Sequence, residues 1–123
     1  MKIDETNYKK YISALSVQMF CINNQFDRTV TLSDIAETNI NLTKIYEVIM
    51  QIQMFLVENK GIISVDEFKS QQQKINSLFK YHECLEIKFK NARRIMFDLA
   101  KKGSITSDKD SILFTTDDDL LHN

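Results

Sequence analysis

The longest hydrophobic pattern in this chain is a heptad repeat in its second half. Its positions alternate in steps of three and four residues, which places them all on one face of an α-helix. The ten positions are Phe68, Gln71, Ile75, Leu78, His82, Leu85, Phe89, Ala92, Met96 and Leu99. Such a face is typical of a seam between packed helices. We therefore predict a long helix over about residues 65–102.

Two earlier segments carry apolar stripes with helical spacing, and they predict helices over about residues 4–27 and 32–60. The first stripe comprises Tyr8, Ile12, Leu15, Met19, Ile22 and Phe26. The second comprises Ile35, Leu42, Ile45, Ile49, Ile52 and Leu56. Because short connections make consecutive helices antiparallel neighbours, the predicted fold is all-α: an antiparallel three-helix bundle of coiled-coil type with a long third helix.

Residues with known preferences for helix ends support these boundaries. Thr31 and Asp34 form a weak variant of the capping box, and Ser64 and Glu67 form a better one. Gly61 and Gly103 stand where many helices end in a left-handed residue. The chain has two glycines and no proline, a composition that favours long helices over turn-rich folds.

The C-terminal segment differs from the rest of the chain in charge. Residues 104–123 hold five Asp and one Lys, about −4, whereas the other 15 basic and 12 acidic residues give about +3. We assign residues 1–103 to one helical bundle domain and residues 104–123 to a short acidic tail, partly ordered or disordered. Two cysteines without paired spacing and the lack of a signal-peptide pattern favour a cytoplasmic protein.

The predicted helices present apolar surface that would be covered by a bend of the third helix near Asn91, by the tail folding back, or by a second chain. The third helix, about 57 Å long, would project beyond the second helix at residues 93–102, which include Ile95, Met96, Phe97 and Leu99. The second helix is apolar nearly all round over residues 45–57, except near Glu47, Gln51 and Glu58. We expect a homo-oligomer or a constitutive protein partner. The segment is too short to span a membrane.

Large apolar residues also occur inside the acidic tail. Ser111–Thr116 is a β-prone run, and Leu120 and Leu121 stand near the end. They either dock on a partner and become ordered there, or pack on the chain's own third helix. The candidate partner-binding residues are Ile95, Phe97, Ile112, Leu113, Phe114, Leu120 and Leu121.

Residues suited to catalysis are few. A hydrolase or transferase needs a nucleophile, a base and an orienting group, but the histidines are His82, at a seam position, and His122. Cys84 points about 200° away from His82 around a helix, so the two cannot share a metal. Two isolated glycines make no phosphate-binding loop. We expect no enzyme, no metal and no cofactor, and we interpret His82, Gln71, Thr38 and Asn59 as polar seam residues that set register.

The sequence therefore indicates a small cytosolic protein–protein interaction module: an adaptor, assembly factor or chaperone-like accessory protein that acts through its helix faces and tail. The alternative is a nucleic-acid-directed protein. It would bind through a basic face of the third helix, or its aspartates would imitate phosphates and inhibit a nucleic-acid enzyme. The pI of about 6.1 and the absence of a recognisable reading helix make this alternative the weaker one. The basic face comprises Lys90, Arg93, Arg94 and Lys101, with Lys88 and Lys102 beside them.

Overall fold

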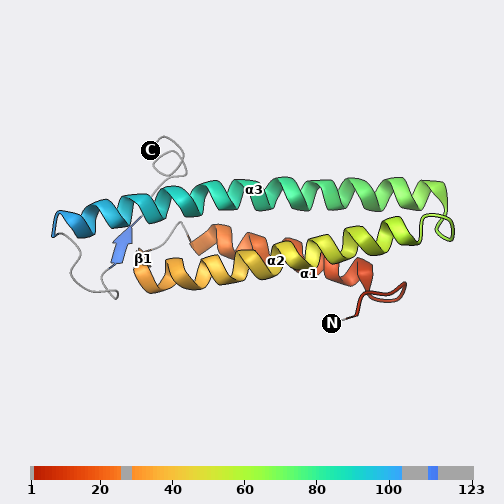
Figure 1. The fold of residues 1–123 in the computed structure, drawn as a ribbon, viewed down its shortest axis with the longest axis horizontal. Coiled ribbons are helices and arrows are strands. Elements are labelled where there is room, and N and C mark those ends of the chain that lie inside the picture. Colours follow the sequence, from red (N-terminus) through yellow and green to blue (C-terminus); the bar gives the residue numbers. More distant parts are fainter. Residues whose placement is uncertain (1, 26–28, 104–110, 114–123) are drawn as a thin grey trace.

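The computed structural model describes residues 2–25, 29–103 and 111–113 as an all-α bundle of three helices (Figure 1). Helix α1 spans Tyr8–Gln25, α2 spans Leu32–Glu58 and α3 spans Val65–Lys101. Two strands of three residues accompany them, β1 at Thr29–Thr31 and β2 at Ser111–Leu113. With 37 residues, α3 is the longest element, and α1 and α2 both pack against it.

Contacts between distant residues show which helix ends lie together. Tyr8, at the start of α1, stacks on Phe55 near the end of α2, with ring centroids 5.2 Å apart. The Tyr8 hydroxyl also donates a hydrogen bond of 2.9 Å to Glu67 at the start of α3. Farther along, Lys88 of α3 donates to the side chain of Asn23 in α1. The start of α1, the end of α2 and the start of α3 therefore share one end of the bundle.

The buried side chains form one core and recur at heptad spacing. In α2 they occupy every third or fourth position from Ile35 to Leu56, and in α3 from Gln71 to Met96. Of the ten predicted positions in α3, eight are buried, and Phe68 and Leu99 are partly buried against the core. Each large apolar side chain buried in this way stabilises the fold by about 1.5–3 kcal/mol.

Helix α1 begins at Tyr8, later than the predicted residue 4, and a turn at residues 5–7 that Asp4 and Asn7 cap precedes it. The Asp4 carboxylate accepts from the Asn7 amide at 3.0 Å, and the Asn7 side chain accepts from the Asp4 amide at 2.8 Å. This reciprocal pairing satisfies two backbone donors of the first turn. The predicted end of the helix, residues 26 and 27, lies outside the described residues.

The end of α2 differs from the expectation at two residues. The side-chain and backbone N–H groups of Asn59 both bond to the carbonyl of Phe55, at 2.8 and 3.1 Å. Asn59 therefore caps α2 and does not form a polar layer in the seam. Among the described residues only Gly103 has a positive φ, 77°, so the left-handed conformation expected at Gly61 is wrong.

Part of the tail pairs with the chain's own backbone. Strand β2 lies antiparallel to β1, with Thr31 opposite Ser111, Val30 opposite Ile112 and Thr29 opposite Leu113. Most of the apolar end of α3 is covered within the single chain: Met96 is fully buried, and Ile95 and Leu99 are partly buried. The rest of the tail, residues 104–110 and 114–123, lies outside the described residues.

Candidate interaction surfaces

Helix α2 carries a second heptad on its exposed side, which we call the outer seam. Its positions follow one another in steps of three and four residues, and all are exposed. The positions are Ile40, Thr43, Glu47, Met50, Met54 and Val57. The exposed fraction is 38% for Met50 and 55–56% for Ile40, Met54 and Val57. Four of the six positions thus present large apolar side chains to solvent.

The outer seam repeats the buried seam of α2 with an offset of five residues. Ile45 and Ile49 are buried, and Met50 and Met54 follow them by five. At about 100° per residue, five residues turn the helix by about 140°. Helix α2 therefore has two apolar faces, of which the described part of the chain buries only one.

The same offset gives a mostly polar face on α3, whereas on α1 it reaches Val17 and Phe20, which are 62% and 58% exposed. Five residues after the buried positions of α3, all side chains are exposed and most are charged. These positions are Asn76, Lys80, Glu83, Ile87, Lys90, Arg94, Phe97 and Lys101. A face of this composition is an ordinary solvated helix surface.

The structure does not gather the predicted partner-binding residues into one exposed patch. Phe97 is 52% exposed, whereas Ile95 is partly buried against the core. Ile112 and Leu113 are placed by the backbone pairing of β2 with β1. The remaining candidates, Phe114, Leu120 and Leu121, lie outside the described residues.

The predicted basic residues are exposed on α3, with one exception nearby. Lys90, Arg93, Arg94 and Lys101 are all exposed, and the Arg93 guanidinium lies 5.6 Å from the centre of the Phe89 ring. Phe97 stands among them, four residues from Arg93 and from Lys101. Lys88, which the sequence grouped with this face, is 7% exposed and points inward to Asn23 of α1.

His82 links α3 to the backbone of α2. Its side chain is buried, with Nε2 2.8 Å from the carbonyl oxygen of Leu42 and Nδ1 3.3 Å from the Glu86 carboxylate. The ring of Tyr46 lies 5.3 Å away, centre to centre. Both ring nitrogens are thus engaged inside the bundle, an arrangement that fixes α3 against α2.

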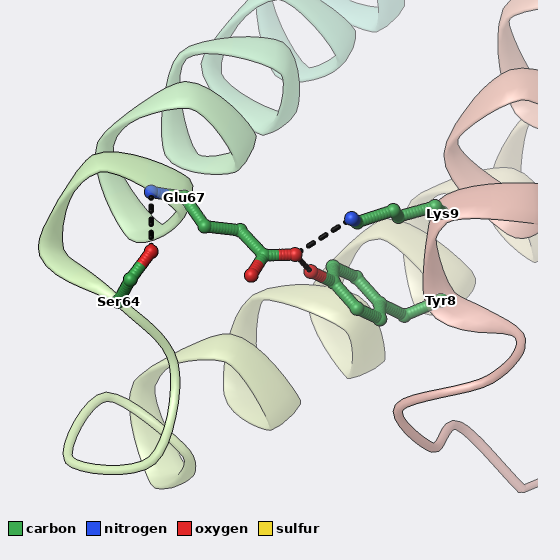
Figure 2. A network of polar contacts seen from close by, with 4 residues as sticks. All are labelled: Tyr8, Lys9, Ser64 and Glu67. Carbon is green, nitrogen blue, oxygen red and sulfur yellow. Dashed lines mark hydrogen bonds and ion pairs between the residues drawn. The ribbon is translucent and has the colours of Figure 1, made fainter.

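A polar cluster at the start of α3 joins that helix to α1 (Figure 2). Ser64 accepts a hydrogen bond from the backbone of Glu67, but the Glu67 carboxylate points to α1 and completes no capping box with Ser64. It accepts from the Tyr8 hydroxyl at 2.9 Å and lies 2.6 Å from Lys9 Nζ. The capping box that is complete is the one expected to be weak, Thr31 with Asp34.

The cluster of Tyr8, Lys9, Ser64 and Glu67, which we call the Glu67 cluster, shifts two ionisation equilibria. Hydrogen bonds from Lys9 and then Tyr8 lower the pKa of Glu67 below its ordinary value of 4.5. Burial, followed by the hydrogen bond to Glu67, raises the pKa of Tyr8 to about 12. Both shifts come from the contact that Glu67 of α3 makes with Tyr8 and Lys9 of α1.

Two grooves flank α1. One, of about 540 Å³, lies between α1 and α2 and includes Cys21 and Lys44. The other, of about 510 Å³, lies between α1 and α3 and includes Ser13 and Gln71. Among their lining residues, no histidine or carboxylate occurs that could act as a general base. In the described ranges no three His, Cys, Asp or Glu side chains cluster as metal ligands would.

Within residues 2–25, 29–103 and 111–113, no helix combines the length and apolar character needed to cross a membrane. Comparison with known proteins gives no match among protein-family models, curated proteins or solved structures. The function is therefore inferred from the chain's own surfaces.

Proposed function

We propose that this chain is a small helical protein–protein interaction module and that the outer seam of α2 is its main binding face. The observation that supports this most directly is the second heptad, because it gives α2 the spacing with which one helix packs against another. In this proposal the bundle is of the antiparallel coiled-coil type, and a partner helix adds to it along α2.

The chemistry of the outer seam suits a protein partner. Met50 and Met54 occupy its centre, and methionine side chains adapt to the shape of an opposing surface. Covering such side chains removes apolar surface from water, at about 25 cal/mol for each Å². An adaptor, assembly factor or chaperone-like accessory protein acts through a face of this kind. We place it in the cytoplasm and assign it no enzymatic role; the exposed free thiols of Cys21 and Cys84 support a reducing compartment.

Site-specific photo-cross-linking tests the proposal. A photoreactive amino acid is placed at Met54 in the full chain, and a matched control carries it at Gln73, which is exposed on α3. We expect a covalent protein adduct of defined mass from position 54, none from position 73, and loss of the adduct when Val57→Glu is added. No adduct from position 54, or the same adducts from both positions, would overturn the proposal.

Nucleic-acid binding is the second candidate function, and the exposed basic face favours it. Lys90, Arg93, Arg94 and Lys101 can contact phosphates, while Phe97, 52% exposed among them, can stack on a base. The other form of this candidate, an acidic mimic, depends on Asp117, Asp118 and Asp119, which lie outside the described residues.

Fluorescence anisotropy with a labelled single-stranded oligonucleotide separates the two candidates. Nucleic-acid binding requires an affinity that falls steeply with salt, and Arg94→Gln reduces that salt dependence by about one phosphate contact. Binding that is absent at low salt, or unchanged in Arg94→Gln and Phe97→Ala, removes this candidate. Either result leaves the outer seam of α2 as the proposed functional face.

A further inference from the structure

We infer that the partner helix at the outer seam is α2 of a second copy of this chain, lying antiparallel about a two-fold axis at the level of Ile52. The inference rests on the proposed function and names the partner. Three observations carry it. Two concern α2, namely the symmetry of its outer seam and the charges that flank the seam. The third is the mostly polar character of the corresponding face of α3.

The last four positions of the outer seam, Glu47, Met50, Met54 and Val57, match themselves when one copy is reversed, whereas Ile40 and Thr43 then face residues beyond the end of α2. About an axis at residue 52, Met50 of one copy faces Met54 of the other, and Glu47 faces Val57. Each pair then occurs twice, as a closed two-fold interface requires. The central contacts are made by Met50 and Met54, and each Glu47 carboxylate lies nearer the end of the interface, where it can remain hydrated.

The flanking charges distinguish the antiparallel from the parallel arrangement. Lys44 and Glu58 are exposed and stand 14 residues apart, so they occupy the same side of the outer seam two heptads from each other. In the antiparallel pair, Lys44 of one copy lies within about 3 Å, along the helix axis, of Glu58 of the other. In a parallel pair Glu47 would face Glu47 of the other copy, which is repulsive, and Lys44 would lie two heptads away from Glu58 of the other copy.

The outer face of α3 is more polar than the outer seam of α2, which makes α2 the better surface of the two for self-association. The residues at matching positions of α3 include Lys80, Glu83, Lys90 and Arg94, which favour solvent. With the axis at Ile52 and α2 ending at Glu58, the two α2 helices overlap over residues 46–58 only, which is a small contact for a protein interface. We therefore expect a dimer that dissociates on dilution.

Disulfide trapping between two differently sized chains tests the inference. Cys21 and Cys84, both exposed, are replaced by serine in the full chain, and one cysteine is introduced as Met50→Cys in one chain and as Met54→Cys in the other. Opposed positions in the antiparallel dimer bring the two thiols within disulfide range. We expect the mixed covalent dimer to predominate over both homodimers, and the Glu47→Cys and Val57→Cys chains to give the same result. A Gln73→Cys chain serves as the exposed control.

Each other outcome has a defined meaning. Preferred Met50→Cys homodimers would show a parallel pair and overturn the inference. Equal trapping with Gln73→Cys would show random collision and overturn it as well. If no disulfide dimer forms but the photoreactive chain still reacts with a different protein, the inference fails and the proposed function stands. If neither experiment gives an adduct, both fail. Circular dichroism of each variant checks that the bundle is folded.

Discussion

Gln71 is the residue whose environment fits its chemistry least well. Its side chain is 6% exposed, and its Oε1 atom is buried with no hydrogen-bond partner in the described part of the chain. A buried acceptor without a partner costs about 1–3 kcal/mol. Met has nearly the same shape as Gln, so we expect Gln71→Met to raise the free energy of unfolding by about 1 kcal/mol in urea denaturation.

Gln53 provides the matched control for that substitution. Its amide exchanges two hydrogen bonds with Gln72 of α3, at 2.8 and 2.6 Å. Gln53→Met removes both bonds, and we expect it to lower the free energy of unfolding by about 1 kcal/mol. Equal effects of the two substitutions would mean that the Oε1 atom of Gln71 has a partner in solution.

The two glycines should respond in opposite ways to alanine. Gly61 has an ordinary φ and open space around the missing Cβ, so Gly61→Ala should stabilise the protein by about 0.4–1 kcal/mol through a smaller loss of backbone entropy. Gly103 has a φ of 77°, where a side chain is strained, so Gly103→Ala should destabilise it by about 1 kcal/mol. Thermal unfolding of both variants checks the pair, and destabilisation by Gly61→Ala would contradict the description of this turn.

At the scale of the helices, the Glu67 cluster joins α1 to α3 in a pH-dependent way. The folded protein lowers the pKa of Glu67 below 4.5, so this contact stabilises the protein above that pH. The contribution is lost as the pH falls through the lower folded value. We expect Glu67→Gln to be less stable than the wild type at pH 7, with a difference that shrinks in acid. Urea denaturation at several pH values measures it, and a difference that is constant with pH would contradict the assignment.

Tyr8 reports the same contact at alkaline pH. Because its pKa is raised to about 12, its stabilising contribution is complete below pH 10 and is lost as the pH rises through 12. Ultraviolet titration of the wild type, minus that of Tyr8→Phe, should show one phenol that ionises near pH 12. In Glu67→Gln that midpoint should move down. An unchanged midpoint would mean that burial alone raises the pKa of Tyr8.

The buried seams were predictable from the sequence because they depend on local spacing. Heptad positions from Ile35 to Leu56 and from Phe68 to Leu99 are buried or partly buried where the pattern placed them. Contacts that join distant residues were not predictable. The Glu67 carboxylate bonds to Tyr8 rather than to the backbone of Ser64, and Lys88 donates to Asn23, because a partner from another helix is available. Strand β1 had one local signal, the β-branched run Thr29–Thr31.

The candidate interface was predictable only in part. The sequence predicted the buried stripe of α2 and showed that this helix is apolar nearly all round, but it did not single out the second heptad as the exposed one. In the structure Ile45, Ile49 and Ile52 are buried, whereas Met50 and Met54 are exposed. The tail candidates Phe114, Leu120 and Leu121 stay predictions, because residues 114–123 lie outside the described part of the chain.

At the scale of the whole molecule, folding and association should be separable. Met54 is 56% exposed and contributes little to the core, so Met54→Glu should change the free energy of unfolding of the single chain by no more than about 0.5 kcal/mol. The same substitution places a carboxylate in the centre of the proposed dimer and should prevent it. Urea denaturation at low protein concentration measures the first effect. A large loss of stability there would mean that the outer seam serves the fold of one chain.

Light scattering coupled to size-exclusion chromatography tests the central claim, self-association through the outer seam, most directly. With rising concentration, the mass of the wild type should approach twice the 14.4 kDa of one chain, while that of Met54→Glu should stay at 14.4 kDa. Gln73→Glu, the matched substitution on α3, should associate like the wild type. A wild-type mass of 14.4 kDa at every concentration, or equal association of the wild type and Met54→Glu, would contradict the account.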